Sequence, residues 1–483
     1  MKLYALRKYA FVFFIACLPT ILLADQLPDL GDPSSQTLSP SAEYRLGQSA
    51  MITIRHAMPL NHDILANNYI NALGTRLQSA EQNKQFAFEF FIINEDAINA
   101  FALPGGFIGI NTGLILTTDS EDELASVMSH EMSHVTQRHI ARLYAYRKQM
   151  TIGTMAGALA AVIIATQNPQ AGSGALMATI AGQAQSSLSF SRNNEQEADR
   201  VGIQLMSNAG FDPLAMPKFF EKLHQSSRFS GQYVPEYLQT HPLTQSRIAD
   251  AKNRAQQLPK VQDSLRHQDF WFTKARLKNE QFTMPKDSVA FFEQPLKETA
   301  PESAKLAHQY GLALGLLANN QSEKALSLLQ TLSANDPDNP YILVALADTY
   351  VAQNQLSTAV KLLQQAVKAR PAELALVVTL VELQLQAEQP KKAIQLLDQY
   401  HLHYGENTFT LRLISRAYGQ AGKPTSMHFY QAKYLEKLGE YHSALDQLKL
   451  VKLPQENKDR MSLQIEAKMA EIKEQIENDK KPL

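Results

Sequence analysis

One cysteine, Cys17, occurs among the 483 residues, and its position removes it from the chemistry of the folded chain. It lies in an apolar run from Tyr9 to Leu23, which follows a basic start and precedes Ala24, a small residue suited to cleavage. That order is typical of a secretory signal peptide over residues 1–24, so we expect export to a bacterial periplasm. An uncleaved membrane anchor is the alternative, although the run is shorter than the roughly 20 residues that a spanning helix needs.

Cleavage after Ala24 would leave a mature chain without cysteine. Such a chain forms no disulfide in an oxidising compartment. It also offers no thiolate to a metal ion, so any zinc site must be built from histidine, aspartate or glutamate.

The chain has no excess of charge of either sign, with 46 basic and 47 acidic residues and a formal net charge of −1. Loss of the basic residues Lys2, Arg7 and Lys8 with the leader would leave 43 basic residues and a net charge of −4. Neither balance gives an electrostatic reason to expect nucleic-acid binding. Hydrophobic residues make up 45% of the chain, which argues against wholesale disorder, and the length suffices for two or three domains.

Long hydrophobic runs are also scarce, and the one ambiguous region is 151–190. Thr151 to Ala165 is small and apolar, Asn168-Pro169 interrupts it, and Gly172 to Phe190 is rich in alanine, glycine and serine. Each half is short or polar for a membrane span. We favour a soluble helical hairpin near the active site, and a membrane hairpin or a peripheral membrane contact is the alternative.

Residues 43–270 are predicted to form a first domain behind a tether at 25–42. Helical spacing of apolar residues predicts a helix from Asp63 to Leu77, and aromatic and β-branched residues predict a buried strand from Phe86 to Ile93. Pro104-Gly105-Gly106 predicts a turn before a second short strand.

Two further helices are predicted in this domain. Ser120 and Glu123 form a capping-box pattern that begins a helix, which we expect to run to about Tyr146. Another helix is predicted from Ser191 to Ser207. The fold class that follows is mainly α, with an α+β first domain that contains a small sheet.

A repeat fills the C-terminal part of the chain, which we place at 301–483 after a linker at 271–300. Ala325, Ala359 and Ala393 are each 34 residues apart within similar Ala-Leu or Ala-Val segments. A period of 34 with a small alanine in the second helix is typical of tetratricopeptide repeats. Ala444 lies 51 residues after Ala393, so the register there is irregular, and a last amphipathic helix is expected to cap the stack.

The segment His130-Glu131-Met132-Ser133-His134 lies in the helix predicted from Ser120. His130 and His134 are four residues apart, so they project from one face and can bind one metal ion. In this motif the glutamate takes a proton from the metal-bound water and passes it to the leaving amine. Two surface histidines on an amphipathic helix would match the same pattern by chance.

The third ligand must come from elsewhere, and the helix after Ser191 supplies the candidates. Glu195 and Asp199 are four residues apart and share a face, whereas Glu197 points away from both. We predict that Glu195 binds the metal and that Asp199 holds the far nitrogen of a ligand histidine, as partners of ligand histidines do in zinc sites. The alternative is a solvated charged helix face.

Spacing alone does not favour a functional role for two other histidines. His139 lies five residues after His134, about 140° around a continuous helix, so we do not expect it to be a ligand. His241 stands before Pro242, which indicates a loop, and such a histidine more often has no functional role.

Together these motifs resemble the zinc peptidase family that contains HtpX and the CaaX prenyl endopeptidases. The resemblance covers about 95–255 and adds the matching segments Asn99-Ala100-Phe101, Pro104-Gly105-Gly106 and Gly113-Leu114, as well as His241-Pro242 with Arg247. A signal peptide and a C-terminal repeat array make the chain most similar to the periplasmic BepA type of that family.

The resemblance implies zinc ligands at His130, His134 and Glu195, with Glu131 as base and Arg247 in a supporting role. It implies that His241 can approach the zinc and hold the protease latent. It further implies that the edge formed by Phe107-Ile108-Gly109-Ile110 receives substrate as an added strand.

In cellular terms the resemblance implies a protease with a chaperone-like role, which assists assembly of outer-membrane β-barrel proteins and degrades stalled or misassembled ones. The repeats would dock at the outer-membrane barrel assembly machinery. The alternative, from another class, is a non-catalytic repeat adaptor that carries a latent zinc fold.

Overall fold

The computed structural model describes residues 38–81, 83–144, 152–167, 192–229, 235–259, 268–451 and 459–479. The predicted signal peptide, most of the predicted tether and the second half of the 151–190 region lie outside these residues. The prediction of a mainly α chain with a small sheet, followed by helical repeats, is confirmed. Among the described residues, no helix combines the length and the apolarity needed to cross a membrane.

A three-stranded sheet lies at the centre of the N-terminal part, in the order β1-β3-β2. Strand β1 (Glu89–Ile93) is parallel to β3 (Phe107–Asn111), and β2 (Ala100–Ala102) is antiparallel to β3. The predicted Pro-Gly-Gly turn is a short 3-10 helix, η2 (Pro104–Gly106), and Gly105 adopts a φ of 77°, which favours glycine.

Because β3 is hydrogen-bonded on both sides, the prediction that Phe107-Ile108-Gly109-Ile110 forms a free edge is wrong. A strand paired on both sides has no backbone groups left for a substrate. The short strand β2 escaped prediction and lies at the edge of the sheet next to the helix that carries the histidines.

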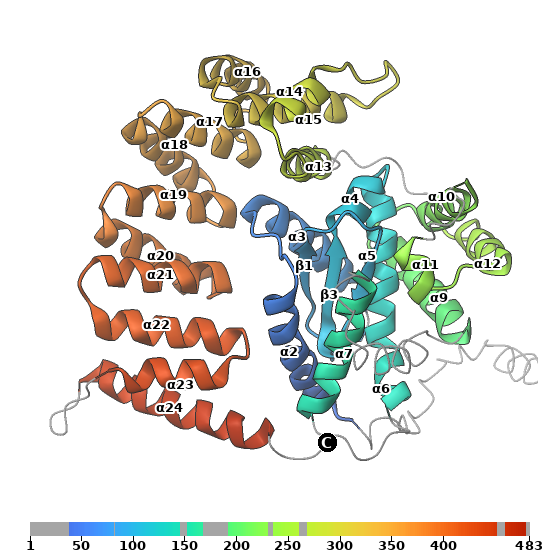
Figure 1. Ribbon diagram of the computed structural model, residues 1–483, viewed down its shortest axis with the longest axis horizontal. Helices are drawn as coiled ribbons and strands as arrows, with labels where there is room; N and C mark the ends of the chain where they lie inside the picture. Colours follow the sequence, from blue (N-terminus) through green and yellow to red (C-terminus); the bar gives the residue numbers. More distant parts are fainter. Residues whose placement is uncertain are drawn as a thin grey trace, which may run out of the picture.

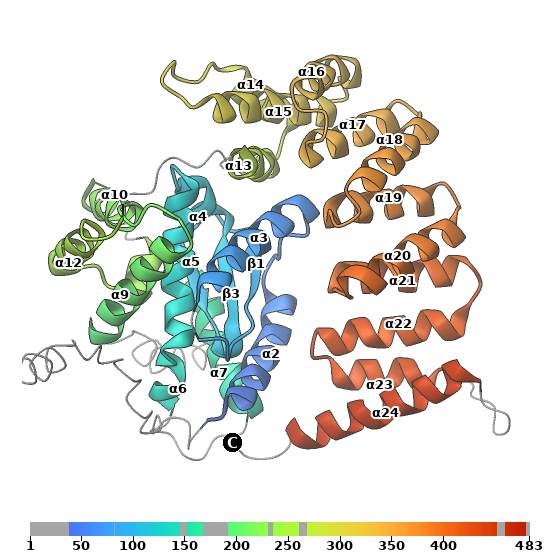
Figure 2. The same ribbon diagram turned by 180° about the vertical axis from the view of Figure 1, so that it is seen from behind.

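Helices surround the sheet (Figures 1 and 2). In the first part of the chain they are α2 (Pro40–Ala57), α3 (Ile64–Ala80), α4 (Thr112–Thr117), α5 (Glu121–Thr136), α6 (His139–Tyr144), α7 (Ile152–Gln167), α9 (Arg192–Asn208), α10 (Ala215–Phe229), α11 (Glu236–Thr240) and α12 (Gln245–Ala255). The first half of the predicted hairpin, α7, packs against α2.

The predicted helix from Ser120 begins as expected and ends early. The Ser120 hydroxyl accepts a hydrogen bond from the backbone of Glu123 and caps α5. The helix stops at Thr136, because Arg138 adopts a φ of 54° and redirects the chain into α6. The expectation of one helix to about Tyr146 is therefore wrong, and no glycine or proline in the sequence marks the break.

The region expected as a linker contains two helices, α13 (Gln268–Glu280) and α14 (Pro285–Glu293). The remaining helices are α15 (Glu302–Ala318), α16 (Ser322–Asn335), α17 (Pro340–Ala352), α18 (Leu356–Ala369), α19 (Leu374–Gln386), α20 (Pro390–Tyr404), α21 (Thr408–Gln420), α22 (Pro424–Lys437), α23 (Tyr441–Lys449) and α24 (Arg460–Asp479). The boundaries of the domains stay predictions, since α13 packs on helices of both parts.

The repeat helices form a curved column beside α2 and α3 (Figure 1). Ala325, Ala359 and Ala393 lie on α16, α18 and α20 and are fully buried, as small residues at close helix contacts should be. Ala444 is equally buried on α23, which stands half a repeat out of register with them. A cleft of about 700 Å³ separates the column from α2 and β1 and is lined by both parts.

Candidate metal centre

The two histidines of the HExxH motif lie one turn apart on α5 and are completely buried. Their Nε2 atoms are 3.0 Å apart and point to the same place. Helix α9 runs across α5 at this level, and Gly202 permits the approach, because a Cβ atom there would lie 3.3 Å from the backbone nitrogen of His130. The close crossing brings Glu195 over the two rings.

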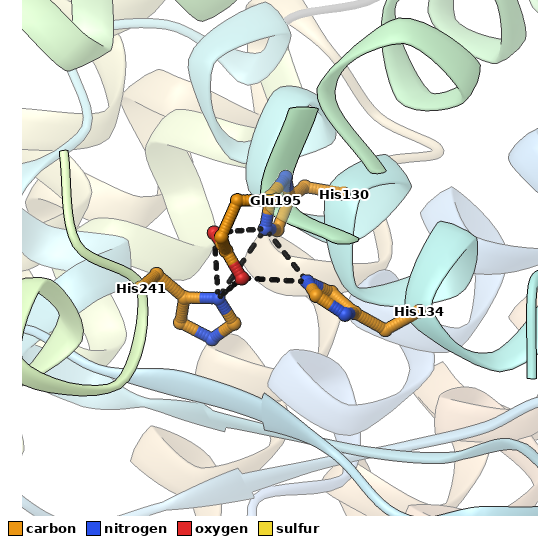
Figure 3. Close-up of side chains that lie close together, drawn as sticks. All are labelled: His130, His134, Glu195 and His241. Carbon is orange, nitrogen blue, oxygen red and sulfur yellow. Dashed lines mark hydrogen bonds and ion pairs between the residues drawn. The ribbon is translucent and has the colours of Figure 1, made fainter. Parts of the chain in front are cut away.

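Four donor atoms converge at this point, from His130, His134, Glu195 and His241 (Figure 3). The Glu195 carboxylate lies 3.5 Å from Nε2 of His130 and 3.4 Å from Nε2 of His134. Nδ1 of His241, from the end of α11, lies 3.1 Å from Glu195 and 3.4 Å from Nε2 of His130. A single cation between these atoms could contact all four, so the cluster fits a metal ion.

The charges of the buried groups also favour a cation. Glu131, Glu195 and Asp199 are all buried, and the guanidinium of Arg247 is the fixed positive group among them. With the histidines neutral, as metal ligands are, three carboxylates against one guanidinium leave a surplus of two negative charges, which would be costly in a buried site without compensation. A divalent metal ion would balance that surplus.

Electrostatic effects on the ligands follow from this arrangement. Burial alone would lower the pKa of His130, but the hydrogen bonds to Asp199 and Glu195 raise it to about 10. Burial would raise the pKa of Glu195, but the neighbouring histidines hold it well below its usual range. Burial keeps the pKa of His134 well below that of a free histidine. The carboxylates therefore create a strong negative potential at the donor atoms.

Asp199 lies behind the ring of His130. Its Oδ1 is 3.0 Å from Nδ1 of His130, on the side of the ring away from the cluster. Arg247 donates to both oxygens of Asp199 at 2.8 Å and lies 2.8 Å from Oε2 of Glu195. The same guanidinium donates to the carbonyl of Pro242, so one side chain ties both carboxylates to the loop of His241.

Glu131 stands beside the donor cluster and is not part of it. Neither of its oxygens makes a well-formed hydrogen bond among the described residues, although the backbone of Ala102 favours its charged form. Burial is the largest effect and raises the pKa of Glu131. Nε2 of His241 lies 3.5 Å from Oε1 of Glu131, while Nδ1 of the same ring faces His130.

Two residues around the centre escaped sequence reasoning. His139 is not among the four clustered donors, and its Nδ1 lies 2.9 Å from Nδ1 of His134. Tyr237, fully buried on α11, stacks on the ring of His241 with 4.7 Å between ring centroids. The break in the helix at Arg138 brings His139 next to His134. No local sequence signal indicates this contact or the stacking of Tyr237 on His241.

Comparison with known proteins agrees with these observations. The sequence profile of Peptidase family M48 matches residues 65–255, and tetratricopeptide repeat profiles match residues 316–375 and 355–407. The Beta-barrel assembly-enhancing protease of Escherichia coli is 42% identical over 328 residues, which are 67% of this chain and 66% of that protein. The chain thus spans slightly less than two thirds of that relative.

Two further relatives extend the comparison. The Putative beta-barrel assembly-enhancing protease of Vibrio cholerae is 38% identical over 337 residues, which are 69% of each chain. The Mitochondrial metalloendopeptidase OMA1 of Arabidopsis thaliana is 34% identical over 156 residues, which are 32% of this chain and 29% of that protein. The second match is confined to a third of the chain, so it reflects a shared domain.

Proposed function

Because the chain belongs to peptidase family M48, we propose that it is a zinc-dependent endopeptidase with ligands at His130, His134 and Glu195. The observation that carries the proposal is the convergence of donors 3.0–3.5 Å apart beside a carboxylate without a well-formed hydrogen bond. Zinc ligands about 2.0–2.1 Å from the ion in a tetrahedral site lie about 3.3–3.4 Å from one another, so a zinc ion would fit among these donors.

Each residue has a proposed task in peptide hydrolysis. Bound zinc would make a water more acidic and polarise the substrate carbonyl. Glu131 accepts the proton of the attacking water and delivers it to the leaving amine. Asp199 and Arg247 fix the orientation of His130, as outer partners of ligand histidines do.

His241 is proposed to hold the protease latent. Its Nδ1 takes the fourth position of the cluster, which a catalytic zinc site keeps for water and substrate. His241 must therefore withdraw before hydrolysis, and the loop held by Arg247 must move with it.

The substrate strand is proposed to add to β2 in place of β3. Phe101 pairs with Gly109 of β3, and the residues on either side, Ala100 and Ala102, turn their backbone groups to the other side. Ala102 is also the residue whose backbone acts on Glu131. A peptide added there would pass the general base.

For the cellular role we propose assistance to β-barrel assembly, which the names of the bacterial relatives indicate. We place it in the periplasm because the sequence begins with a predicted signal peptide. Stalled or misfolded outer-membrane proteins would be the substrates, and chaperone-like assistance would be the second outcome of binding. The repeat column would dock the barrel assembly machinery, since stacked helical repeats present extended binding surfaces.

The decisive experiment compares wild type with Glu131→Gln on an unfolded outer-membrane barrel protein. The variant keeps the ligands and loses the base, so zinc content measured by metal analysis should be unchanged and cleavage should fall by ~10²- to 10⁴-fold. Glu221→Gln, which alters a partly exposed ion pair with Lys252, serves as the matched control. Equal cleavage by wild type and Glu131→Gln would leave the non-catalytic adaptor as the better description.

A further inference from the structure

His139 connects the metal ligand His134 to a carboxylate at the protein surface. Its Nδ1 lies 2.9 Å from Nδ1 of His134, and its Nε2 lies 3.1 Å from Oε2 of Glu197. The His139 side chain is fully buried, whereas Glu197 is 39% exposed and pairs with Arg142 at 3.2 Å. The ligand, His139, Glu197 and Arg142 thus form one continuous polar chain.

The ligand role of His134 fixes the direction of every hydrogen bond in that chain. A histidine that presents the lone pair of Nε2 to a cation carries its proton on Nδ1. Nδ1 of His134 therefore donates to Nδ1 of His139, which accepts and carries its own proton on Nε2. That proton is donated to the Glu197 carboxylate, so each nitrogen of His139 has a partner of the right kind.

The backbone is bent to make this contact. On a continuous helix His139 would lie about 140° around the axis from His134, but α5 ends at Thr136 and Arg138 adopts a φ of 54°. Such a conformation is unfavourable for a residue with a side chain. The Arg138 guanidinium pairs with Glu43 of α2 at 2.6 Å and donates to the carbonyl of Leu38, which holds the turn in place.

The other proposed ligand, His130, also has polar partners, but its chain contains no intervening histidine. Nδ1 of His130 meets Asp199 directly, and both Asp199 and its partner Arg247 are buried. Nδ1 of His134 meets the ring of His139, whose other nitrogen contacts Glu197. The two ligands are therefore oriented by separate chains, one buried and one that reaches solvent.

We propose that His139 and Glu197 are positioning residues, which hold His134 in the proton form and orientation that metal binding requires. The inference rests on the proposed metal centre and extends it to residues outside the donor cluster. Loss of such outer partners weakens metal binding by ~10- to 100-fold in other proteins. Neither residue touches the donor position itself, so the effect must be transmitted through His134.

The test measures the affinity of the full mature chain for Zn²⁺ by competition with a chelator, together with the absorption spectrum of the Co²⁺ form. His139→Phe keeps a ring of similar size and removes both nitrogens, so Zn²⁺ affinity should fall by ~10- to 100-fold. His139→Asn supplies an amide oxygen that can accept from His134, so it should recover most of that loss and restore the Co²⁺ spectrum. The wild type and His134→Ala give the upper and lower limits.

Glu197→Gln tests the outer end of the chain. It should weaken Zn²⁺ binding in the wild type and have no further effect in His139→Phe, because its influence passes through that ring. Glu221→Gln is the matched control, since its side chain is 44% exposed and also forms an ion pair.

Three outcomes separate the possibilities. Unchanged Zn²⁺ affinity in His139→Phe and Glu197→Gln would overturn the inference. An equal loss in His139→Phe and His139→Asn, with a lower unfolding temperature of the metal-free chain, would assign His139 a packing role and would also overturn it. If the wild type binds Zn²⁺ no better than His134→Ala, the proposed metal centre fails, and this result is distinguishable from the other two.

Discussion

At the residue scale, Arg247 determines how the centre is assembled. Its guanidinium contacts Asp199, Glu195 and the carbonyl of Pro242, so it joins the partner of one ligand, a second ligand and the loop of His241. The planar, five-donor group suits this bridging task, and a lysine could not reproduce it. The proposed withdrawal of His241 would therefore disturb the same side chain that contacts Asp199 and Glu195.

We predict that His241→Ala raises or deregulates proteolysis of an unfolded barrel protein. The variant removes the ring that now stands 3.4 Å from Nε2 of His130 and opens the fourth position to water. A tenfold rise in rate would mean that the closed form is favoured by ~1.4 kcal/mol. His62→Ala, at an exposed histidine, is the control. Loss of activity would indicate a catalytic role for His241, and unchanged activity would remove both roles.

At the scale of elements, the crossing of α5 and α9 builds the centre and α13 joins it to the repeats. Lys274 of α13 donates to the carbonyl of Thr118, at the end of α4, and lies over the rings of Phe270 and Trp271. Burial lowers the pKa of Lys274 to about 8. The contact between α13 and α4 is therefore sensitive to alkaline pH.

The sign of that sensitivity follows from proton binding. Between pH ~8 and ~10.5 the folded chain has released the Lys274 proton while the unfolded chain still holds it, so this group makes stability rise with pH. We predict that Lys274→Met removes this rise. The measurement is the free energy of unfolding in denaturant from pH 7 to 10, with the exposed Lys218→Met as control. Parallel curves for wild type and Lys274→Met would contradict the prediction.

At the scale of the whole molecule, the repeats hold the protease part from two directions. Near the start of the column, Arg276 of α13 pairs with Asp63, the cap of α3, and donates to the hydroxyl of Tyr310 at 2.7 Å. Near its end, the Tyr441 hydroxyl donates to Gln48 of α2 at 2.7 Å. Since α2 also carries Glu43, which holds the turn before His139, the repeats rest on a helix that supports the centre.

We predict that Arg276→Met lowers the stability of the entire chain by ~3–5 kcal/mol, because it leaves the largely buried Asp63 carboxylate without its partner. Thermal unfolding should remain a single transition at lower temperature, since Leu65 of α3 shares a hydrophobic core with Phe272 and Tyr310. Arg254→Met, at an exposed ion pair, is the control. Two separate transitions, of which only one moves, would mean that the protease part and the repeats unfold independently.

The hydrophobic core shared by α13 and α15 means that removal of the repeats is expected to destabilise the remaining chain. Removal of residues after about 300 would be a direct way to test whether the repeats serve only for docking. That cut would expose Phe272 and Ala275, which pack on Tyr310 and Ala313 of α15. Loss of metal binding in such a fragment would therefore reflect unfolding, and substitutions in the full chain are the better probes.

Local physics explains what the sequence by itself determined about this protein. His130 and His134 share a face of α5, and Glu195 and Asp199 share a face of α9, because a helix has 3.6 residues per turn. The 34-residue period is read directly from the spacing of Ala325, Ala359 and Ala393. The resemblance to the peptidase family added His241 and Arg247, which spacing alone did not single out.

Only the tertiary structure decided which groups those helices meet. Strand β3 pairs with β1 and β2 through contacts that sequence patterns do not specify. It is therefore the central strand, and β2 lies at an edge. The place of His139 depends on an ion pair between Arg138 and Glu43, 95 residues apart, which holds a backbone conformation that local preference disfavours. Such long-range contacts produce no periodic pattern in the sequence. His139, the proposed partner of His134, could therefore be identified only from the tertiary structure.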